Sequence, residues 1–196
     1  MNIIRIETIN STNSYLKELV LKQTLEEGTV VVADNQTAGR GQRGNFWESQ
    51  AGKNITCSMI FYPTFLPVDR IFLLLEAVSL GVKETLEVFT SEITIKWPND
   101  IYYRDKKIAG ILIENEFSGN TCSYSVAGTG ININQEIFVS DAPNPVSLKQ
   151  ITGKEQDLDF FLKILIEKIM FRYEQLKAGE FETITKLYQD SLCRKN

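Results

Sequence analysis

The sequence predicts an α+β domain with a mixed, largely antiparallel sheet and helices packed on one face. Runs of strand-like residues meet a few helical stripes without the strict alternation that is typical of a parallel sheet. The chain has 196 residues, which is about the length of one domain. Because no repeat, low-complexity tract or linker divides it, we expect one domain over residues 1–196.

The first third of the chain combines short strands with one helix. β-Branched runs and alternation of side chains predict the strands, potential N-caps predict the helix, and a glycine-rich stretch predicts an extended loop. We expect strands over residues 2–7, 29–33 and 55–62, a helix from Ser11–Asn13 to about residue 23, and a loop over residues 37–53.

Two strong helical stripes frame the remaining strands. Apolar residues recur at i, i+3, i+4 and i+7 in both stripes, as on the buried face of a helix. We expect helices over residues 71–89, from residue 158 to at least 169, and from about 180; strands over residues 93–96, 106–117 and 122–132; and a loop over residues 133–156. The turn at residues 118–120 predicts a hairpin between the last two strands.

The composition excludes several kinds of chemistry. The chain has no histidine, which removes His-assisted serine or cysteine triads, His-ligated zinc and imidazole acid–base catalysis. A net charge of −4 argues against a general nucleic-acid binder. Three cysteines without CxxC spacing indicate reduced thiols in a cytosolic protein. No signal peptide and no apolar run long enough to cross a bilayer is apparent.

Residues 39–44 read GRGQRG, a literal G-x-G-x-x-G after a predicted strand. A dinucleotide-binding fingerprint requires a helix at this point, and a kinase loop requires a V-A-I-K-like strand; neither follows. There remains a glycine-rich loop whose Arg40 and Arg43 could bind a carboxylate or phosphate. Trp47 could stack on a planar base, or it could be a core residue beside a solvated loop.

A second segment, residues 96–100, reads KWPND. The proline ends a strand and fixes a turn, so Asn99 and Asp100 project from a rigid corner. Lys107 follows seven residues after Asp100 and opens the next strand. We therefore expect this lysine and this carboxylate to lie close together.

A third segment, residues 128–134, reads GTGININ at the end of a predicted strand. Its glycines would admit a ligand, and the amide of Asn132 offers hydrogen bonds to it.

Together these segments resemble the biotin–protein ligases. The resemblance rests on residues 39–47, 96–100, 107–114 and 128–132 in this order, extended by Ser11–Asn13 and residues 144–148, and it covers about residues 2–190. It implies a fold similar to class II aminoacyl-tRNA synthetases and a two-step reaction. Biotin attacks the α-phosphate of Mg-ATP to give biotinyl-5′-adenylate, and a lysine of a biotin carboxyl carrier domain then takes the biotinyl group.

The resemblance also implies roles for individual residues. Lys107, with Arg40 and Asp100, would be catalytic: Lys107 would bind the carboxylate of biotin and then stabilise charge on the phosphate. Trp47 would stack on adenine, and Asn99, Asp100 and Asn132 would reach the nucleotide. The expected binding set is Ser11, Thr12, Asn13, Gln36, Gly39, Arg40, Gly41, Gln42, Arg43, Trp47, Asn99, Lys107, Gly110 and Asn132, with no separate metal site.

The second step poses a proton problem in a chain without histidine. The acceptor lysine, with an ordinary pKa of about 10.4, must lose a proton before it attacks. Asp100, the adenylate phosphate or water must take this proton; Asp100 could instead help to hold Mg²⁺.

Two positions depart from the family pattern. Many members carry arginine where this chain has Gln42 and Asn45. With two fewer cations facing phosphate, we expect the protein to hold biotinyl-adenylate less tightly, unless Arg43 or Lys53 substitutes.

Two alternatives stay open. A lipoate–protein ligase or octanoyltransferase shares this fold and resembles the chain at Lys107, but such a transferase usually requires a reactive cysteine. Cys57 and Cys122 fall at apparent core positions, and Cys193 lies near the end of the chain. The second alternative is a non-catalytic module that binds biotin or the adenylate.

The resemblance further implies which neighbouring domains and partners to expect. Regulatory members have a DNA-binding helix-turn-helix before the catalytic domain, for which the ten residues before Ser11 leave no room. Members usually also have a small SH3-like barrel after it, which we expect to be absent or truncated here. We expect a cytoplasmic monomer or homodimer that acts on the carrier domain of a biotin-dependent carboxylase, without nucleic acid or membrane.

Overall fold

The computed structural model describes residues 2–140 and 144–193, apart from the side chain of Arg43. Seven strands of this described part form one sheet in the order β1-β2-β3-β7-β6-β5-β4. β1 runs parallel to β2, and all other neighbouring strands are antiparallel. The strands are β1 (Ile3–Ile9), β2 (Val30–Gln36), β3 (Ile55–Phe61), β4 (Ile93–Lys96), β5 (Asp100–Tyr103), β6 (Lys106–Ser118) and β7 (Thr121–Ile131). The predicted α+β class with a mixed, largely antiparallel sheet is confirmed.

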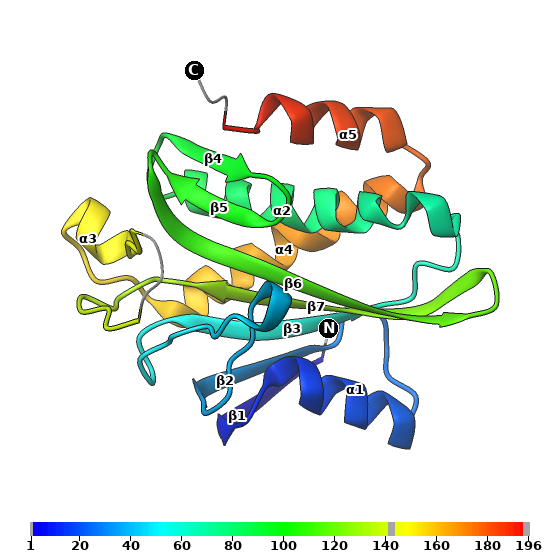
Figure 1. Ribbon diagram of the computed structural model, residues 1–196, viewed down its shortest axis with the longest axis horizontal. Helices are drawn as coiled ribbons and strands as arrows, with labels where there is room; N and C mark the ends of the chain where they lie inside the picture. Colours follow the sequence, from blue (N-terminus) through cyan, green and yellow to red (C-terminus); the bar gives the residue numbers. More distant parts are fainter. Residues whose placement is uncertain (1, 141–143, 194–196) are drawn as a thin grey trace.

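The helices divide between the two faces of the sheet. They are α1 (Thr12–Lys22), α2 (Phe72–Glu87), α3 (Leu148–Thr152), α4 (Leu158–Lys177) and α5 (Phe181–Asp190), with 3-10 turns η1 (Gln42–Gly44) and η2 (Val68–Arg70). As expected, α2 and α4 cover one face of the sheet, and α5 packs against α2, but the expectation that the helices share one face is wrong for α1. α1 lies on the opposite face, beside β2, β3 and β7 (Figure 1).

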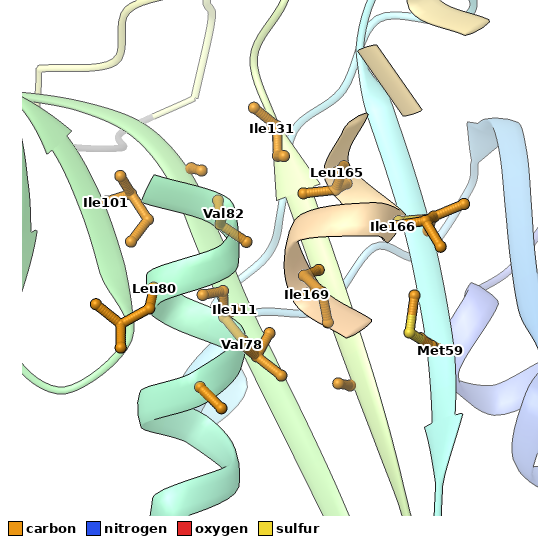
Figure 2. Close-up of a cluster of buried hydrophobic side chains, with 14 of the residues drawn as sticks. Met59, Val78, Leu80, Val82, Ile101, Ile111, Ile131, Leu165, Ile166 and Ile169 are labelled. Carbon is orange, nitrogen blue, oxygen red and sulfur yellow. The ribbon is translucent and has the colours of Figure 1, made fainter. Parts of the chain in front are cut away.

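The main core lies between the sheet and the pair formed by α2 and α4. Val78 and Val82 of α2 and Leu165 and Ile169 of α4 lie between the helices and the sheet (Figure 2). Gly81 lets the two helices approach closely, because a Cβ there would lie 2.7 Å from the Cα of Ile169. Burying each such side chain stabilises the fold by about 1.5–3 kcal/mol.

A smaller apolar cluster joins α1 to the other face. Leu16 of α1 packs with Val31, Ile60 and Val126 of the sheet. Ser11 begins this helix, since its side chain accepts a hydrogen bond from the backbone N–H of Ser14. The amphipathic sequence of α1 gives no sign of which face of the sheet it covers, so the sequence did not distinguish the two faces.

The C-terminal part of the described chain borders the corner that follows β4. The backbone N–H of Ile95 donates to Ser191 over 2.8 Å, and that of Cys193 donates back to Ile95 over 2.8 Å. The buried hydroxyl of Tyr188 donates to the carbonyl of Pro98 over 2.6 Å. α5 and the residues after it therefore hold the turn from which Asn99 and Asp100 project.

Two elements differ from the sequence-based expectation. β5 begins at the last residue of the expected turn and continues through residues 101–103, where no strand was expected, and α3 lies inside the stretch expected to be a loop. Residues 141–143 of that expected loop lie outside the described residues. In the part of the chain that the structure describes, no helix is both long and apolar enough to cross a membrane.

Candidate functional site

A pocket of about 350 Å³ opens on the α1 face of the sheet. It lies where the starts of α1 and β6, the end of β7 and the glycine-rich loop meet. The lining comprises Ser11, Thr12, Asn13, Gln36, Arg40, Gly41, Gln42, Asn45, Phe46, Trp47, Cys57, Trp97, Pro98, Asn99, Asp100, Lys107, Gly110, Ile111, Leu112, Gly128, Thr129 and Gly130. A volume in this range suits a small-molecule ligand.

The glycine-rich loop forms a tight turn rather than a helix. The N–H of Gly41 donates to the carbonyl of Asn45 over 2.7 Å, and the N–H of Trp47 donates to the carbonyl of Gly39 over 2.9 Å. Only the three-residue turn η1 lies between them. The exclusion of a dinucleotide-binding helix at this loop is therefore confirmed.

The loop lays the indole of Trp47 on two glycines of the sheet. A Cβ on Gly130 would lie less than 3.0 Å from the indole, and a Cβ on Gly110 would lie 3.0 Å from its Cζ3 atom. These two glycines face each other across β6 and β7. Trp47 is half-buried and lines the pocket, so it is a residue of the site and not of the main core.

Lys107 and Asp100 form an ion pair beside the indole of Trp47 and the two glycines on which it lies, which together form the floor of the pocket. The Nζ atom of Lys107 lies 2.7 Å from Oδ1 of Asp100 and 5.6 Å from the centre of the Trp47 ring. The ion pair forms because β5 and β6 are antiparallel neighbours, as the spacing in the sequence led us to expect. Both side chains are largely shielded, with exposed fractions of 21% and 26%.

A chain of hydrogen bonds fixes the polar side chains at the start of α1. Gln36 accepts hydrogen bonds from the backbone N–H and hydroxyl of Thr12, over 2.8 and 3.1 Å. Ser58 of β3 donates to Oδ1 of Asn13 over 2.5 Å and lies 2.7 Å from the hydroxyl of Thr12. Because its oxygen is occupied by Thr12, the amide nitrogen of Gln36 is left to donate to a ligand.

Glu114 of β6 anchors the cation of the glycine-rich loop. Its carboxylate lies 2.8 Å from Nη2 of Arg40, which also donates to the hydroxyl of Ser14 over 3.2 Å. Burial raises the pKa of the Glu114 carboxyl, but the hydrogen bond from Asn13 and the charges of Arg40 and Lys17 outweigh it and hold this pKa below its usual value. Glu114 is thus a charged anchor directly behind the pocket lining.

Most residues expected at the site converge on the pocket. Twelve of them line it: Ser11, Thr12, Asn13, Gln36, Arg40, Gly41, Gln42, Trp47, Asn99, Asp100, Lys107 and Gly110. Gly39 lies beneath Trp47, and the side chain of Arg43 lies outside what the structure describes. Asn132 is buried beside the pocket, where its amide donates to Val146 over 3.2 Å and its Oδ1 has no protein partner.

Sequence reasoning missed two polar residues of this region, Ser58 and Glu114. The alternation along β3 and β6 was the available signal, because both residues lie on the strand faces opposite the core. Among the described residues, no group of three or more His, Cys, Asp or Glu side chains that could hold a metal ion is found.

The structure thus shows an α+β domain with a pocket lined by an indole, by polar side chains at the start of α1 and by two cations, Arg40 and Lys107, each paired with a carboxylate. Residues 5–132 match the sequence model of the biotin/lipoate A/B protein ligase family. This match spans more than half of the chain, and the chain belongs to this family.

Individual relatives agree with this assignment. The bifunctional ligase/repressor BirA of Bacillus subtilis (strain 168) is 32% identical, over 96% of this chain and 58% of that protein. The biotin–[acetyl-CoA-carboxylase] ligase of Paracoccus denitrificans is 31% identical, over 89% of this chain and 74% of that protein. A solved structure of biotin protein ligase from Aquifex aeolicus in complex with biotin and ATP has a TM-score of 0.84 and 30% identity, covering 97% of this chain and 78% of that chain. The chain thus spans 58% of the length of the Bacillus relative.

Proposed function

We propose that this chain is an ATP-dependent ligase that activates biotin as biotinyl-5′-AMP and transfers it to a lysine of a biotin carboxyl carrier domain. The observation that supports this most directly is the convergence of Arg40, Lys107 and Trp47 on one pocket of about 350 Å³. Cations suit a carboxylate and a phosphate, and the indole suits a purine ring. The similarity to biotin–protein ligases over most of the chain supports the same substrates.

The first step joins two anions, so it requires positive charge. A carboxylate oxygen of biotin attacks the α-phosphorus of ATP, the bond to the bridging oxygen breaks, and pyrophosphate leaves. Biotin resembles a side-chain acid with a pKa of about 4–5, so it is already ionised at neutral pH and no general base is needed. Lys107 and Arg40 stabilise the charge that builds on the phosphoryl oxygens.

The same pocket suits Mg²⁺ carried by the nucleotide. In nucleotide sites this ion is usually held by one or two carboxylates together with the phosphates, and Asp100 is a carboxylate in the lining. When bound, Mg²⁺ would neutralise charge on the phosphates. One oxygen of Asp100 is ion-paired with Lys107, and the second oxygen would be available to the ion.

In the second step the amine of the acceptor lysine attacks the acyl carbon. AMP leaves with the electron pair of the broken C–O bond, and the proton of the amine passes to Asp100, to the adenylate phosphate or to water. Oδ1 of Asp100 is already ion-paired with the ammonium of Lys107 at 2.7 Å, and the second oxygen would hold Mg²⁺, so neither oxygen is left to take this proton. We therefore favour the phosphate or water as the acceptor of this proton.

A cysteine-dependent acyltransferase fits the chain less well. Cys57 lies beside the pocket, but burial raises the pKa of its thiol to about 12, so it carries no thiolate at neutral pH. Cys122 is fully buried in the sheet, away from the pocket lining. The described cysteines thus offer no nucleophile at the site.

Biotin-dependent exchange between ATP and labelled pyrophosphate tests the proposal. We expect exchange with biotin and none with lipoate. Exchange with lipoate alone would identify a lipoate ligase, and biotin binding without exchange would identify a non-catalytic module. Transfer of labelled biotin to a recombinant carrier domain then tests the second step. We further propose that the protein works in the cytoplasm as a monomer or homodimer.

A further inference from the structure

Glu114 lies behind the pocket and contacts both α1 and the glycine-rich loop. It is on β6, two residues after Leu112, and it lies on the strand face that carries Gly110. Its side chain has an exposed fraction of 21%, and it is not part of the pocket lining. Any effect of Glu114 on a ligand must therefore pass through the residues that it holds.

Four polar contacts converge on its two oxygens. Oε2 accepts from Nδ2 of Asn13 and from Nη2 of Arg40, each over 2.8 Å. Oε1 accepts from Nη1 of Arg40 over 3.4 Å and from Nζ of Lys17 over 3.3 Å. The carboxylate thus binds both terminal nitrogens of the Arg40 guanidinium, which fixes the plane as well as the position of this group.

The contact with Asn13 fixes the second pocket residue. Asn13 is 4% exposed, and its Nδ2 donates to Glu114 and, over 3.2 Å, to the carbonyl of Leu112. Its Oδ1 accepts from Ser58 over 2.5 Å. Loss of the carboxylate would remove one of the hydrogen bonds that fix which side of the Asn13 amide carries the nitrogen and which carries the oxygen. The chain of hydrogen bonds that continues through Ser58 to Thr12 would lose its outer anchor.

Charge gives a second reason why Arg40 depends on Glu114. Lys17 and Arg40 both lie beside the same carboxylate, so without it two cations would repel each other across this junction. Arg40 lies on an exposed loop, and its side chain is 45% exposed. Apart from Glu114, the guanidinium is held by its hydrogen bond to the hydroxyl of Ser14. A guanidinium with one restraint would leave the pocket rim for solvent much of the time.

We propose that Glu114 is a positioning residue, which aims the Arg40 guanidinium and the Asn13 amide at the activated acid and thereby sets how long the adenylate is retained. The inference rests on the proposed function, since it concerns the same pocket.

The test compares Glu114→Gln with Glu116→Gln. Both variants remove one charge from the same face of β6, but Glu116 is exposed and lies two residues farther from the pocket. We measure kcat and KM in biotin-dependent exchange, the rate at which biotinyl-adenylate is released, and the melting temperature. Glu114→Gln should release the adenylate about tenfold faster and lower kcat in proportion, because the hydrogen bonds from Arg40 and Asn13 lose their charged acceptor. Release as slow as in Glu116→Gln would overturn the inference.

The same substitution in an Arg40→Ala variant separates an effect on positioning from an effect on stability. Because Glu114 acts in part through Arg40, Glu114→Gln should accelerate release by a clearly smaller factor once Arg40→Ala is present, and the remaining effect is the part that passes through Asn13. An undiminished effect in that background would overturn the role assigned to Glu114. Should Glu114→Gln fail to fold, Glu114→Asp replaces it with Glu116→Asp as its control. The shortened carboxylate no longer spans Asn13 and Arg40, so release should again be faster, and equal rates would overturn the inference.

The outcomes for the two proposals are distinguishable. Exchange by the unmodified protein, with equal release from the Glu114 and Glu116 variants, overturns the positioning role alone. Absence of biotin-dependent exchange in the unmodified protein overturns the proposed function, and this inference with it.

Discussion

A methyl group on Gly130 would test the floor of the pocket directly. A Cβ there would lie less than 3.0 Å from the Trp47 indole. Carbon atoms in ordinary contact lie about 3.5–4.0 Å apart, so the indole must move by at least about 0.5 Å. Gly130 is not among the glycines with positive φ, so an alanine causes no backbone strain of its own. The cost of Gly130→Ala is therefore that of overpacking, about 1–3 kcal/mol.

The structure indicates that Trp47, and not Gly130, will move to relieve this overpacking. Gly130 lies in β7 between β3 and β6 and cannot move, whereas Trp47 is half-buried on a loop and can. We expect Gly130→Ala to displace the indole and raise the KM for ATP by about 5–150-fold, which is the equivalent of 1–3 kcal/mol. Because the displaced indole is outside the main core, the melting temperature should change little.

Steady-state exchange kinetics over a range of ATP concentrations provide the assay. Trp47→Ala removes the atoms that the new methyl would meet, so Gly130→Ala should add little on that background. Independent losses in the double variant would refute the placement of the indole on the glycine floor. A large drop in melting temperature with an unchanged KM would refute the reasoning in another way.

Three further changes have definite expected outcomes. Tyr188→Phe removes the hydrogen bond to Pro98, worth about 1 kcal/mol, and should lower kcat of exchange by several-fold. Tyr173→Phe, which loses a buried hydrogen bond to Glu27 far from the pocket, is its control and should leave kcat unchanged; equal kcat values in the two variants would contradict this. Gln42→Arg adds a cation to the lining and should slow adenylate release, and an unchanged rate would argue against that effect. Burial raises the pKa of Glu27, but bonds from Tyr173, the backbone N–H of Tyr62 and Lys177 prevail and lower this pKa below 4.5. The ionised Glu27 carboxylate therefore stabilises the fold above pH 4.5, and this stabilisation is lost as the pH falls through its folded-state pKa. With Glu27→Gln, the free energy of unfolding measured with denaturant should fall less steeply as the solution is acidified. An unaltered slope would count against this assignment.

Most of the fold could be predicted because strong local patterns mark its elements. The stripes of α2 and α4 and the alternation of β3 and β7 all persist over several turns or residue pairs. β5 has four residues and starts directly after the Pro98–Asn99 corner, so turn signals masked it. α3 could have been found from its capping box, in which Ser147 and Gln150 bond reciprocally.

The site was predictable where its residues are close in sequence. Asp100 and Lys107 meet because a short turn connects neighbouring strands, and spacing alone indicated this contact. Arg40 and Glu114 are 74 residues apart, and their contact depends on the order of strands in the sheet and on the face that α1 covers. Neither property can be predicted from the sequence near Arg40 or Glu114, so the partner of Arg40 was not foreseen.

The two faces of the central strands have a consequence for how such a protein can change over time. Along β3, β6 and β7, alternate residues point either to the face that carries the main core or to the α1 face: Met59, Ile111 and Ile131 to the first, Ser58, Gly110 and Gly130 to the second. A saturation mutagenesis scan should therefore show a two-residue rhythm, with loss of folding at one set of positions and loss of ligand binding at the next. Selection on the acid that is recognised can then proceed through one set of positions while the other preserves the scaffold.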